Sequence, residues 1–240
     1  MQAIPTEEQP LSMAQPQQIP VRPKRKRSDR PSHESMSQLI RNVKGWNIIE
    51  ISAGGRTVKE GGLGTKYEKW IVCEYHPDCF VGLHREYTVL SIISQIRTPI
   101  GYPRIIRADF KSGIIVQTSP KVFWRPLWLR IKEPVLDLDS LLQMKRELLE
   151  YIRLVYAKGV GYKVNPNKLF PLRKSEGGWL LYLGGWGETK LCSTPDRIQS
   201  AVWNAQIQSA EWKAQETEQL NGVEQMFTEL CTRLDERLKQ

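Results

Sequence analysis

The 240-residue sequence predicts an α+β fold, either one ordinary domain or one compact two-lobed unit, preceded by a disordered tail. Three observations predict it. Residues 1–37 are rich in Pro, Gln and Ser and lack hydrophobic periodicity. Residues 46–117 contain short apolar runs broken by glycine, which is typical of strands and turns. Residues 137–158 and 195–240 are helical by apolar spacing or by composition.

The composition argues against a membrane or secreted protein. No run of about 18 apolar residues occurs, and the N-terminus lacks the basic start and apolar stretch of a signal peptide. We therefore expect a soluble protein without a membrane partner and with reduced thiols, in the cytosol or nucleus. No CxxC pair occurs, so neither a zinc site nor a disulfide framework is indicated. The four cysteines are Cys73, Cys79, Cys192 and Cys231.

The tail contains a short, strongly basic segment at residues 22–27. Its composition is that of a nuclear import signal or of an arm that contacts nucleic acid, and the alternative is a merely solvated basic stretch. We expect nuclear import, and Ser28 beside the segment is a candidate phosphorylation site. The five basic residues are Arg22, Lys24, Arg25, Lys26 and Arg27.

The next part of the chain predicts strand, strand, helix, strand, strand. Residues 47–51 and 69–73 read as strands that flank a glycine-dense, flexible loop. Residues 83–94 have the apolar spacing of an amphipathic helix, which stops before a proline. Residues 104–110 and 113–117 then form a hairpin.

The second half opens with the strongest helix of the chain. Asp137 or Asp139 can cap a helix that runs to Lys158 and is followed by a glycine suited to a C-terminal cap. Residues 169–172 and 179–183 then predict a second hairpin. An apolar stripe near the C-terminus is expected to pack on the core rather than on a partner. The stripe comprises Met226, Phe227, Leu230, Leu234 and Leu238.

This order of elements resembles the protein kinases. A long helix ending in Lys-Gly, a tight loop, and a hairpin followed by Gly-x-Gly resemble the kinase large lobe from helix E to the metal-binding loop. Asn165-Pro166-Asn167 is close to the loop of small atypical and aminoglycoside-phosphotransferase-like kinases. The resemblance covers roughly residues 46–190. It implies a two-lobed kinase-like fold, with a small lobe at 38–122 and a minimal or truncated large lobe at 123–240. An unrelated α+β fold is the alternative.

The residues that perform kinase chemistry are missing from the matching positions. The family's catalytic loop reads His-Arg-Asp-x-x-x-x-Asn, and its metal-binding loop reads Asp-Phe-Gly. The Asp and Asn of the first loop are lysines here, and an ammonium group has donors but no acceptor for a metal ion. The catalytic-loop positions are Gly161, Lys163 and Lys168, and the metal-loop positions are Gly185, Trp186 and Gly187.

The resemblance also implies a vestigial nucleotide cleft. The small-lobe lysine that pairs with the phosphates falls near Cys73, while Glu86 occupies the place of that lysine's helix partner. Lys66 or Lys69 could substitute for the missing lysine if strand alternation favours it. The cleft candidates are therefore Cys73, Glu86, Lys163 and Lys168. We expect no cofactor or metal, although ATP or another anion could bind without a metal ion.

Three functions follow from these observations. The leading expectation is a catalytically inactive kinase-like protein that serves as a binding or scaffold module for protein partners, in the nucleus. The first alternative is a divergent active ATP-dependent phosphotransferase that uses Asp109, Glu74 or Asp78 in unorthodox roles. The second is a nucleic-acid-binding protein, because residues 38–195 carry 24 basic and 14 acidic residues. Aromatic and basic residues interleave in one stretch, at Trp124, Arg125, Trp128 and Arg130.

Overall fold

The computed structural model describes residues 47–52, 55–64, 68–120, 125–133, 136–174 and 177–239. Contacts within the chain group Val43–Gln240 into one compact unit. Helices and strands both contribute, which confirms the α+β class. The predicted tail with its basic segment, the boundary at residue 122 and Lys66 all lie outside the described residues.

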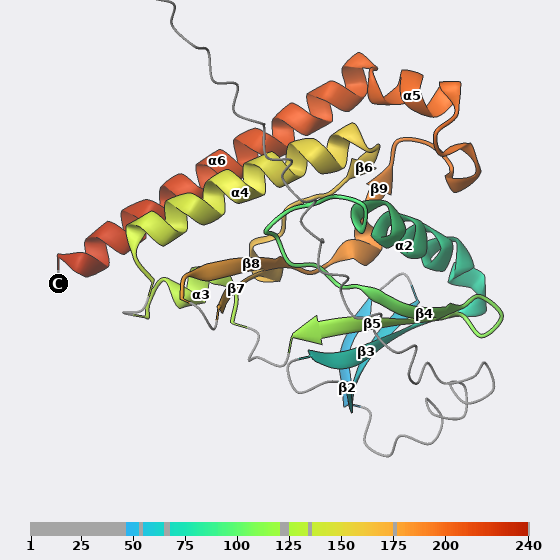
Figure 1. Ribbon diagram of the computed structural model, residues 1–240, viewed down its shortest axis with the longest axis horizontal. Coiled ribbons are helices and arrows are strands. Elements are labelled where there is room, and N and C mark those ends of the chain that lie inside the picture. The colour runs from blue at the N-terminus through green and yellow to red at the C-terminus, as the bar shows by residue number, and fades with distance from the viewer. Residues whose placement is uncertain are drawn as a thin grey trace, which may run out of the picture. The chain divides into compact units, whose positions relative to one another are not determined.

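A five-stranded antiparallel sheet forms the first half of the unit (Figure 1). Its order is β1-β2-β3-β5-β4, so β1 and β4 are the edges. The two predicted hairpin strands, β4 and β5, pair as expected. The strands are β1 (Asn47–Ser52), β2 (Arg56–Gly64), β3 (Glu68–Tyr75), β4 (Ile105–Asp109) and β5 (Ile114–Pro120).

The glycine-dense segment is a strand, and the expectation of a flexible loop there was wrong. Residues 56–64 form β2, which pairs with β1 on one side and with β3 on the other. The backbone of a central strand forms hydrogen bonds with a neighbouring strand on each side. This pairing stabilises β2 as a strand although its glycines have low strand propensity. The register nevertheless shifts between Glu60 and Gly64.

One face of the sheet is covered by α2 (Phe80–Ile93), which follows a short 3₁₀ turn, η1 (Pro77–Cys79). Val58 pairs with Cys73, and Cys73 pairs with Ile115, so that the three side chains form a row across β2, β3 and β5. Leu83 of α2 packs on this row, and all four residues are buried. The predicted helix is confirmed and begins slightly earlier than its apolar spacing suggested.

The second half contains the predicted long helix, α4 (Leu138–Ala157), after a single turn, α3 (Leu127–Arg130). Asp137 is the N-cap, and its carboxylate accepts a hydrogen bond of 2.7 Å from the backbone N–H of Ser140. Gly159 has φ +75°, which a glycine after a helix C-terminus adopts without strain.

The second predicted hairpin is also confirmed. Its strands, β7 (Leu169–Arg173) and β8 (Trp179–Leu183), pair along their whole length. Short elements surround it and carry the chain from α4 toward the C-terminal helices. They are β6 (Val160–Gly161), η2 (Pro166–Lys168), η3 (Trp186–Glu188), β9 (Lys190–Leu191) and η4 (Pro195–Arg197).

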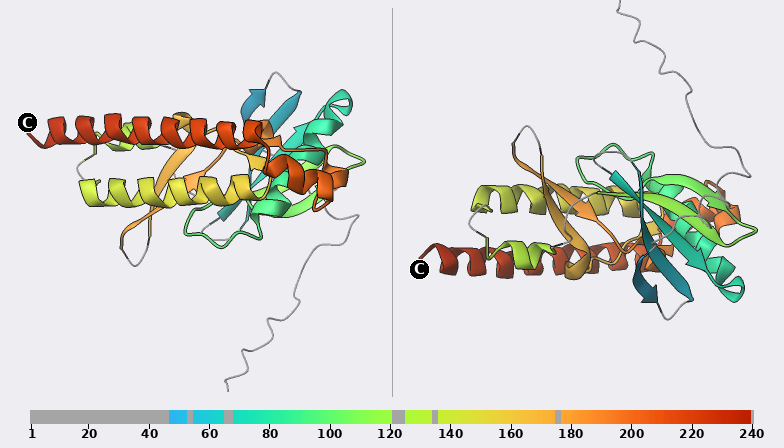
Figure 2. Two further views of the ribbon diagram at one scale, coloured as in Figure 1. Left: turned by 90° about the horizontal axis from the view of Figure 1, so that it is seen from above. Right: turned by 90° about the horizontal axis from the view of Figure 1, so that it is seen from below.

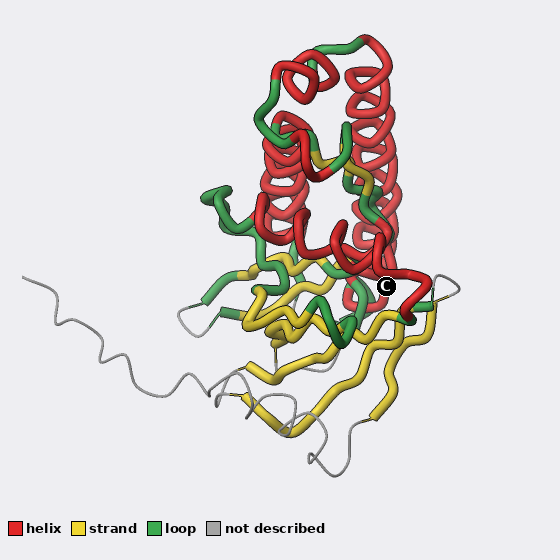
Figure 3. Tube along the Cα trace, turned by 90° about the vertical axis from the view of Figure 1, so that its right-hand side faces the viewer, coloured by secondary structure: helices red, strands yellow, loops and turns green. Residues whose placement is uncertain are grey.

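Two helices complete the unit, α5 (Ala201–Ile207) and α6 (Ala210–Leu238). α6 lies beside α4 over most of its length (Figures 1 and 2), and Figure 3 shows these helices gathered on one side of the strands. The C-terminal stripe packs mainly on the core, as expected. Phe227, Leu230 and Leu234 are buried, whereas Leu238 is 63% exposed. No helix among the described residues has the length and apolar character needed to cross a bilayer.

Both ends of α6 are fastened to the elements around α4. Near its start, the indole Nε1 of Trp212 donates to the backbone oxygen of Tyr156 at 3.0 Å. Near its end, the Arg237 guanidinium donates to the backbone oxygens of Ile131 (2.6 Å), Leu136 (3.2 Å) and Glu133. These bonds hold both ends of α6 against the elements that flank α4.

Candidate functional site

A cleft of about 250 Å³ lies between the five-stranded sheet and the β7–β8 hairpin. The sheet and α2 supply one set of its lining residues, and the hairpin with the turn after it supplies another. The hairpin is tied to the sheet, because the Tyr182 hydroxyl donates to the backbone oxygen of Thr118 at 3.4 Å. The lining residues are Arg56, Val58, Ile71, Glu86, Pro103, Gln117, Lys168, Phe170, Tyr182, Gly184, Gly185 and Trp186.

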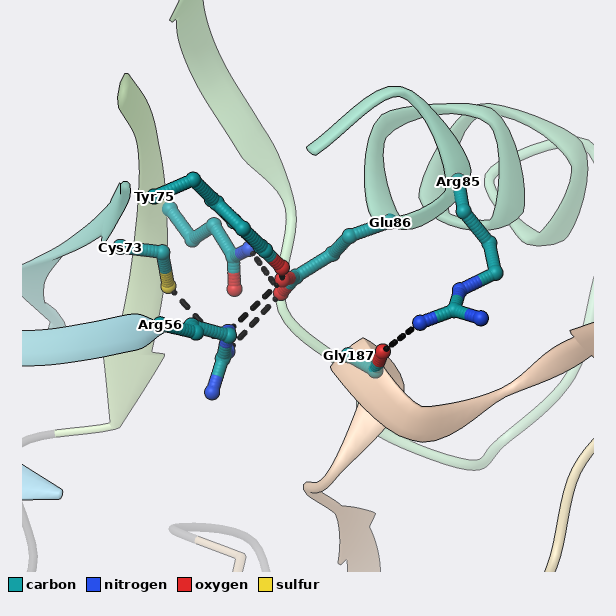
Figure 4. Close-up of polar contacts among 7 residues, drawn as sticks. Arg56, Cys73, Tyr75, Arg85, Glu86 and Gly187 are labelled. Atoms are coloured by element: carbon teal, nitrogen blue, oxygen red, sulfur yellow. Dashed lines mark hydrogen bonds and ion pairs between the residues drawn. The ribbon is translucent and has the colours of Figure 1, made fainter. Parts of the chain in front are cut away.

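Among the described residues, Glu86 of α2 is the one carboxylate that lines the cleft, and it is only 1% exposed. Arg56 donates to it twice, from Nε to Oε2 at 2.8 Å and from Nη2 to Oε1 at 3.0 Å. Gln117 Nε2 donates to Oε1 at 2.6 Å, and the Tyr75 hydroxyl donates to Oε2. Figure 4 shows Arg56 and Tyr75 reaching the carboxylate from the sheet. The negative charge of Glu86 is therefore fully engaged inside the protein.

The electrostatics of Arg56 and Tyr75 follow from this burial. Desolvation lowers the pKa of the Arg56 guanidinium, but the neighbouring Cys73 and Glu86 outweigh it and hold that pKa well above its usual value. Desolvation, together with the Glu86 charge, raises the pKa of the Tyr75 phenol. Arg56 therefore stays charged, and Tyr75 stays a hydrogen-bond donor.

Arg56 is the partner of Glu86 that the sequence analysis missed. Lys69, which was considered as the substitute, pairs with Glu60 instead. Arg56 reaches the site from β2, where it stands opposite Tyr75, and its Nη2 also donates to the Cys73 sulfur at 3.3 Å. The contact between Arg56 and Glu86 follows from the pairing register of β2 with β3. That register could not be predicted, because the glycine-rich composition of β2 is not typical of a strand.

The metal-loop positions form a tight turn at one end of the cleft. Gly185 has φ +82°, and a Cβ atom there would lie 3.3 Å from Lys168 Cγ. A Cβ at Gly187 would lie 3.0 Å from Arg56 Nε. Two cationic side chains therefore pack directly against the glycines of this turn. The backbone oxygen of Gly187 also accepts a bond of 3.3 Å from Arg85 of α2 (Figure 4).

Trp186, between these glycines, is a core residue that also lines the cleft. It is 1% exposed, and its Nε1 donates to the backbone oxygen of Leu183 at 3.0 Å. Its ring lies 4.4 Å from that of Tyr162, centroid to centroid, and packs edge-on against Tyr151 at 6.2 Å. The indole thus anchors the turn that presents Gly185 to the cleft.

The catalytic-loop positions are split between different surroundings. Gly161 is buried against the Trp212 ring, where an added Cβ would come within 3.1 Å of Cη2. Lys163 is exposed and lines a separate pocket beside α6, together with residues such as Glu218 and Met226. Lys168 alone of the three lines the cleft. The structure therefore brings Glu86 and Lys168 to the cleft, leaves Cys73 buried behind Arg56, and places Lys163 elsewhere.

The residues considered for unorthodox catalysis are engaged or distant. Asp109 accepts from the backbone N–H of Lys111 (3.0 Å) and from the hydroxyl of Ser112 (2.9 Å) in the β4–β5 turn. Glu74 pairs with Lys59, and Asp78 is exposed near His76. None of the three lines the cleft. Within the described ranges, no group of three His, Cys, Asp or Glu side chains could hold a metal ion.

The basic and aromatic stretch offers less positive charge than its composition suggested. Arg125 and Arg130 both pair with Glu133, at 2.8 and 2.6 Å. These pairs lower the pKa of the Glu133 carboxyl, with the Arg130 hydrogen bond as the largest cause. The Trp128 indole donates to Asn167 Oδ1 at 2.9 Å, and Trp124 lies outside the described residues.

Comparison with known proteins adds no family or relative to this geometry. The chain matches no protein-family model, and the search of curated proteins finds no significant similarity.

Proposed function

We propose that the protein has a two-lobed protein kinase-like fold and acts as a catalytically inactive binding or scaffold module. Several features support the kinase-like fold together. They are the five-stranded sheet with α2 between β3 and β4, the buried Glu86 paired to a sheet cation, and the cleft above the β7–β8 hairpin. Fold alone does not define function, so the proposal of inactivity depends on the site itself.

One observation carries the proposal of inactivity: among the residues that the structure describes, the cleft lining contains no carboxylate that is available to a metal ion. Phosphoryl transfer needs metal ions that bridge the phosphates and neutralise developing charge. The Glu86 carboxylate already accepts hydrogen bonds from Arg56, Gln117 and Tyr75. The position that should carry the metal-binding aspartate is Gly185, and the nearest side chain to it is the cation Lys168.

The partner surface and the location are further parts of the proposal. A kinase-like unit that catalyses no reaction can act only through the molecules that it binds. We therefore propose that it binds protein partners on its surface. The basic segment at residues 22–27 supports import into the nucleus.

A turnover assay tests the proposal. Purified protein is incubated with ATP and Mg²⁺ or Mn²⁺, while ADP release and phosphate incorporation are followed. We expect no turnover beyond that of a Lys168→Met variant purified in the same way, because a contaminating ATPase would contribute equally to both. Metal-dependent turnover present in the wild type and absent from the variant would overturn the proposal in favour of an active phosphotransferase.

A thermal-shift measurement with ATP complements the assay. A ligand at about 100 times its dissociation constant stabilises the folded state by about 2.7 kcal/mol. Stabilisation by ATP that appears only when Mg²⁺ is added would indicate a working metal site and contradict the proposal.

A further inference from the structure

A second groove, of about 450 Å³, runs beside α6. One wall is the loop at residues 163–166, and the other is the part of α6 at residues 218–226. A hydrogen bond of 3.2 Å from the Val164 backbone N–H to Gln219 Oε1 joins the two walls at one end. The groove shares no lining residue with the cleft, so a molecule can bind here independently of the cleft.

Gly222 is the unusual residue of this groove. It lies within α6, where every residue except proline is more favourable than glycine. No atom lies within 4 Å of a Cβ added at Gly222, so internal packing gives no reason for a glycine. The residue is exposed and lines the groove. The absent side chain leaves room for the backbone of another molecule to approach α6 closely.

Two opposite charges face the groove without pairing. Lys163 lies on the loop wall and Glu218 on the helix wall, each next in sequence to one partner of the bond between Val164 and Gln219. Neither charged side chain forms an ion pair within the part of the chain that the structure describes. A molecule with one acidic and one basic group can therefore pair with both walls at this end.

The polar lining favours an extended peptide over a helix. A helix pairs its own backbone groups and binds in apolar grooves, whereas an extended segment needs partners for its N–H and C=O groups. Asn221 and Gln225 line the groove, and each carries an amide that both donates and accepts.

The exposure of the lining argues against a small molecule. Ligand pockets usually bury about 70–90% of a small ligand's surface. Here Lys163, Pro166, Asn221 and Gln225 are all exposed, so the groove is open to solvent along both walls. A peptide that crosses the surface needs only one of its sides covered.

We propose that this groove binds an extended segment of a protein partner, in which an acidic residue and a basic residue are neighbours. Successive side chains of an extended segment point to opposite sides, so the two neighbours reach Lys163 and Glu218. An apolar residue further along the segment contacts Met226 and Pro166 at the other end of the groove. The inference rests on the proposed function for its biological role, because it names the surface on which the binding module holds a partner.

Selection from a displayed library of random eight-residue peptides tests the proposal on the full chain. We expect the enriched peptides to contain an acidic residue next to a basic one more often than the starting library does. Enriched peptides without such a pair would overturn the assignment of the two charges. A selection with no enrichment over the empty support would overturn the proposal as a whole.

Charge exchange then localises the enriched peptide, whose affinity is measured by fluorescence polarisation. Lys163→Glu should weaken binding about fivefold or more, since an exposed ion pair contributes up to about 1 kcal/mol, which is about fivefold in affinity. Lys158→Glu, at an exposed lysine outside the groove, should leave the affinity unchanged. The double variant Lys163→Glu, Glu218→Lys should prefer the peptide whose acidic and basic residues have exchanged places. Equal effects of the two single substitutions, or an unaltered preference in the double variant, would overturn the assignment.

Gly222→Gln tests the close approach without weakening the fold. Glutamine has the higher helix propensity, so the unfolding temperature should not fall, while the added side chain occupies the groove and should weaken peptide binding. Ala214→Gln, at an exposed position of α6 outside the groove, should bind as the wild type does. Unchanged affinity in a folded Gly222→Gln variant would place the peptide elsewhere and overturn the proposal. Metal-dependent ATP turnover would instead remove the proposed inactivity and leave the peptide binding standing, so the two failures are distinguishable.

Discussion

Arg56 of β2 and Glu86 of α2 form a bidentate ion pair, with 2.8 Å from Nε to Oε2 and 3.0 Å from Nη2 to Oε1. The Glu86 side chain is 1% exposed and that of Arg56 is 12% exposed. The pair connects the sheet to the helix that covers it, and α2 in turn bonds the Gly187 turn through Arg85. The ion pair and the Arg85 hydrogen bond together link the sheet, the helix and the glycine turn around the cleft.

Removing Arg56 should destabilise the protein strongly. Arg56→Met leaves the Glu86 charge buried and uncompensated, which typically costs about 3–5 kcal/mol. Urea unfolding at pH 7 measures the change in the free energy of unfolding.

Two further variants control this prediction. Lys59→Met removes the half-exposed pair with Glu74 and should cost about 1 kcal/mol or less. Adding Glu86→Gln to Arg56→Met removes the orphaned charge, so the double variant should be more stable than Arg56→Met alone. A loss below about 1 kcal/mol in Arg56→Met would show that the pair is dispensable.

Two glycines should respond in opposite directions to alanine. Gly161 is buried against Trp212, so Gly161→Ala forces the indole to move and should destabilise by about 1–3 kcal/mol. Gly222 lies within α6 with no atom within 4 Å of an added Cβ, so Gly222→Ala should stabilise by about 0.5–1 kcal/mol. Thermal unfolding of both variants checks this, and two shifts of the same sign would refute the packing of α6 on Gly161.

The C-terminal end of α6 should loosen without Arg237. Arg237→Ala leaves the backbone oxygens of Ile131, Glu133 and Leu136 without their charged donor, which should cost about 1.5–3 kcal/mol. Hydrogen exchange should speed up in the last turns of α6. Arg233→Ala, at an exposed position on the same helix, should change stability by no more than about 0.5 kcal/mol. Equal effects of the two substitutions would argue against the anchor.

Acid should weaken the cap of α4. The Ser140 backbone N–H and hydroxyl hold the pKa of the Asp137 carboxyl below its usual value. A carboxyl whose pKa is lower in the folded state stabilises the protein above its ordinary pKa of about 3.9, and that stabilisation is lost as the pH falls through the lowered value.

Asp137→Ala should therefore cost about 0.5–2 kcal/mol at pH 7 and progressively less below pH about 3.9. Asp137→Asn keeps an acceptor without the charge, so it should cost less than the alanine and vary less with pH. Urea unfolding across this range measures both variants. A pH-independent difference between wild type and Asp137→Ala would contradict a charged cap.

Local signals in the sequence were enough for much of the fold. The apolar spacing of α4, a cap at Asp137 or Asp139, and the turn between β7 and β8 are short-range features, and each was predicted. The structure selects Asp137 as the cap. β2 was missed because its strand character comes from pairing on both sides rather than from its own residues. Long-range pairing of this kind leaves no pattern within a short window.

The candidate site was only partly predictable for the same reason. Glu86 and Lys168 were identified through the resemblance to kinase motifs, and both line the cleft. Arg56 could not be identified, because it reaches Glu86 only through the register of a strand that was read as a loop. Lys163 and Lys168 are five residues apart, yet the 3₁₀ turn between them directs them into different pockets.

The turn at Gly185 also bears on whether a metal-binding carboxylate could be introduced there by mutation. An aspartate introduced there would start from a φ of +82°, which disfavours any residue with a side chain. Its carboxylate would then meet Lys168 before any metal ion, because the lysine chain already lies 3.3 Å from the position of its Cβ. A single substitution that introduces an aspartate at Gly185 would therefore add an internal ion pair with Lys168 instead of an available metal ligand. The turn thus resists conversion into a metal-binding loop by one change, because Lys168 would have to be replaced as well.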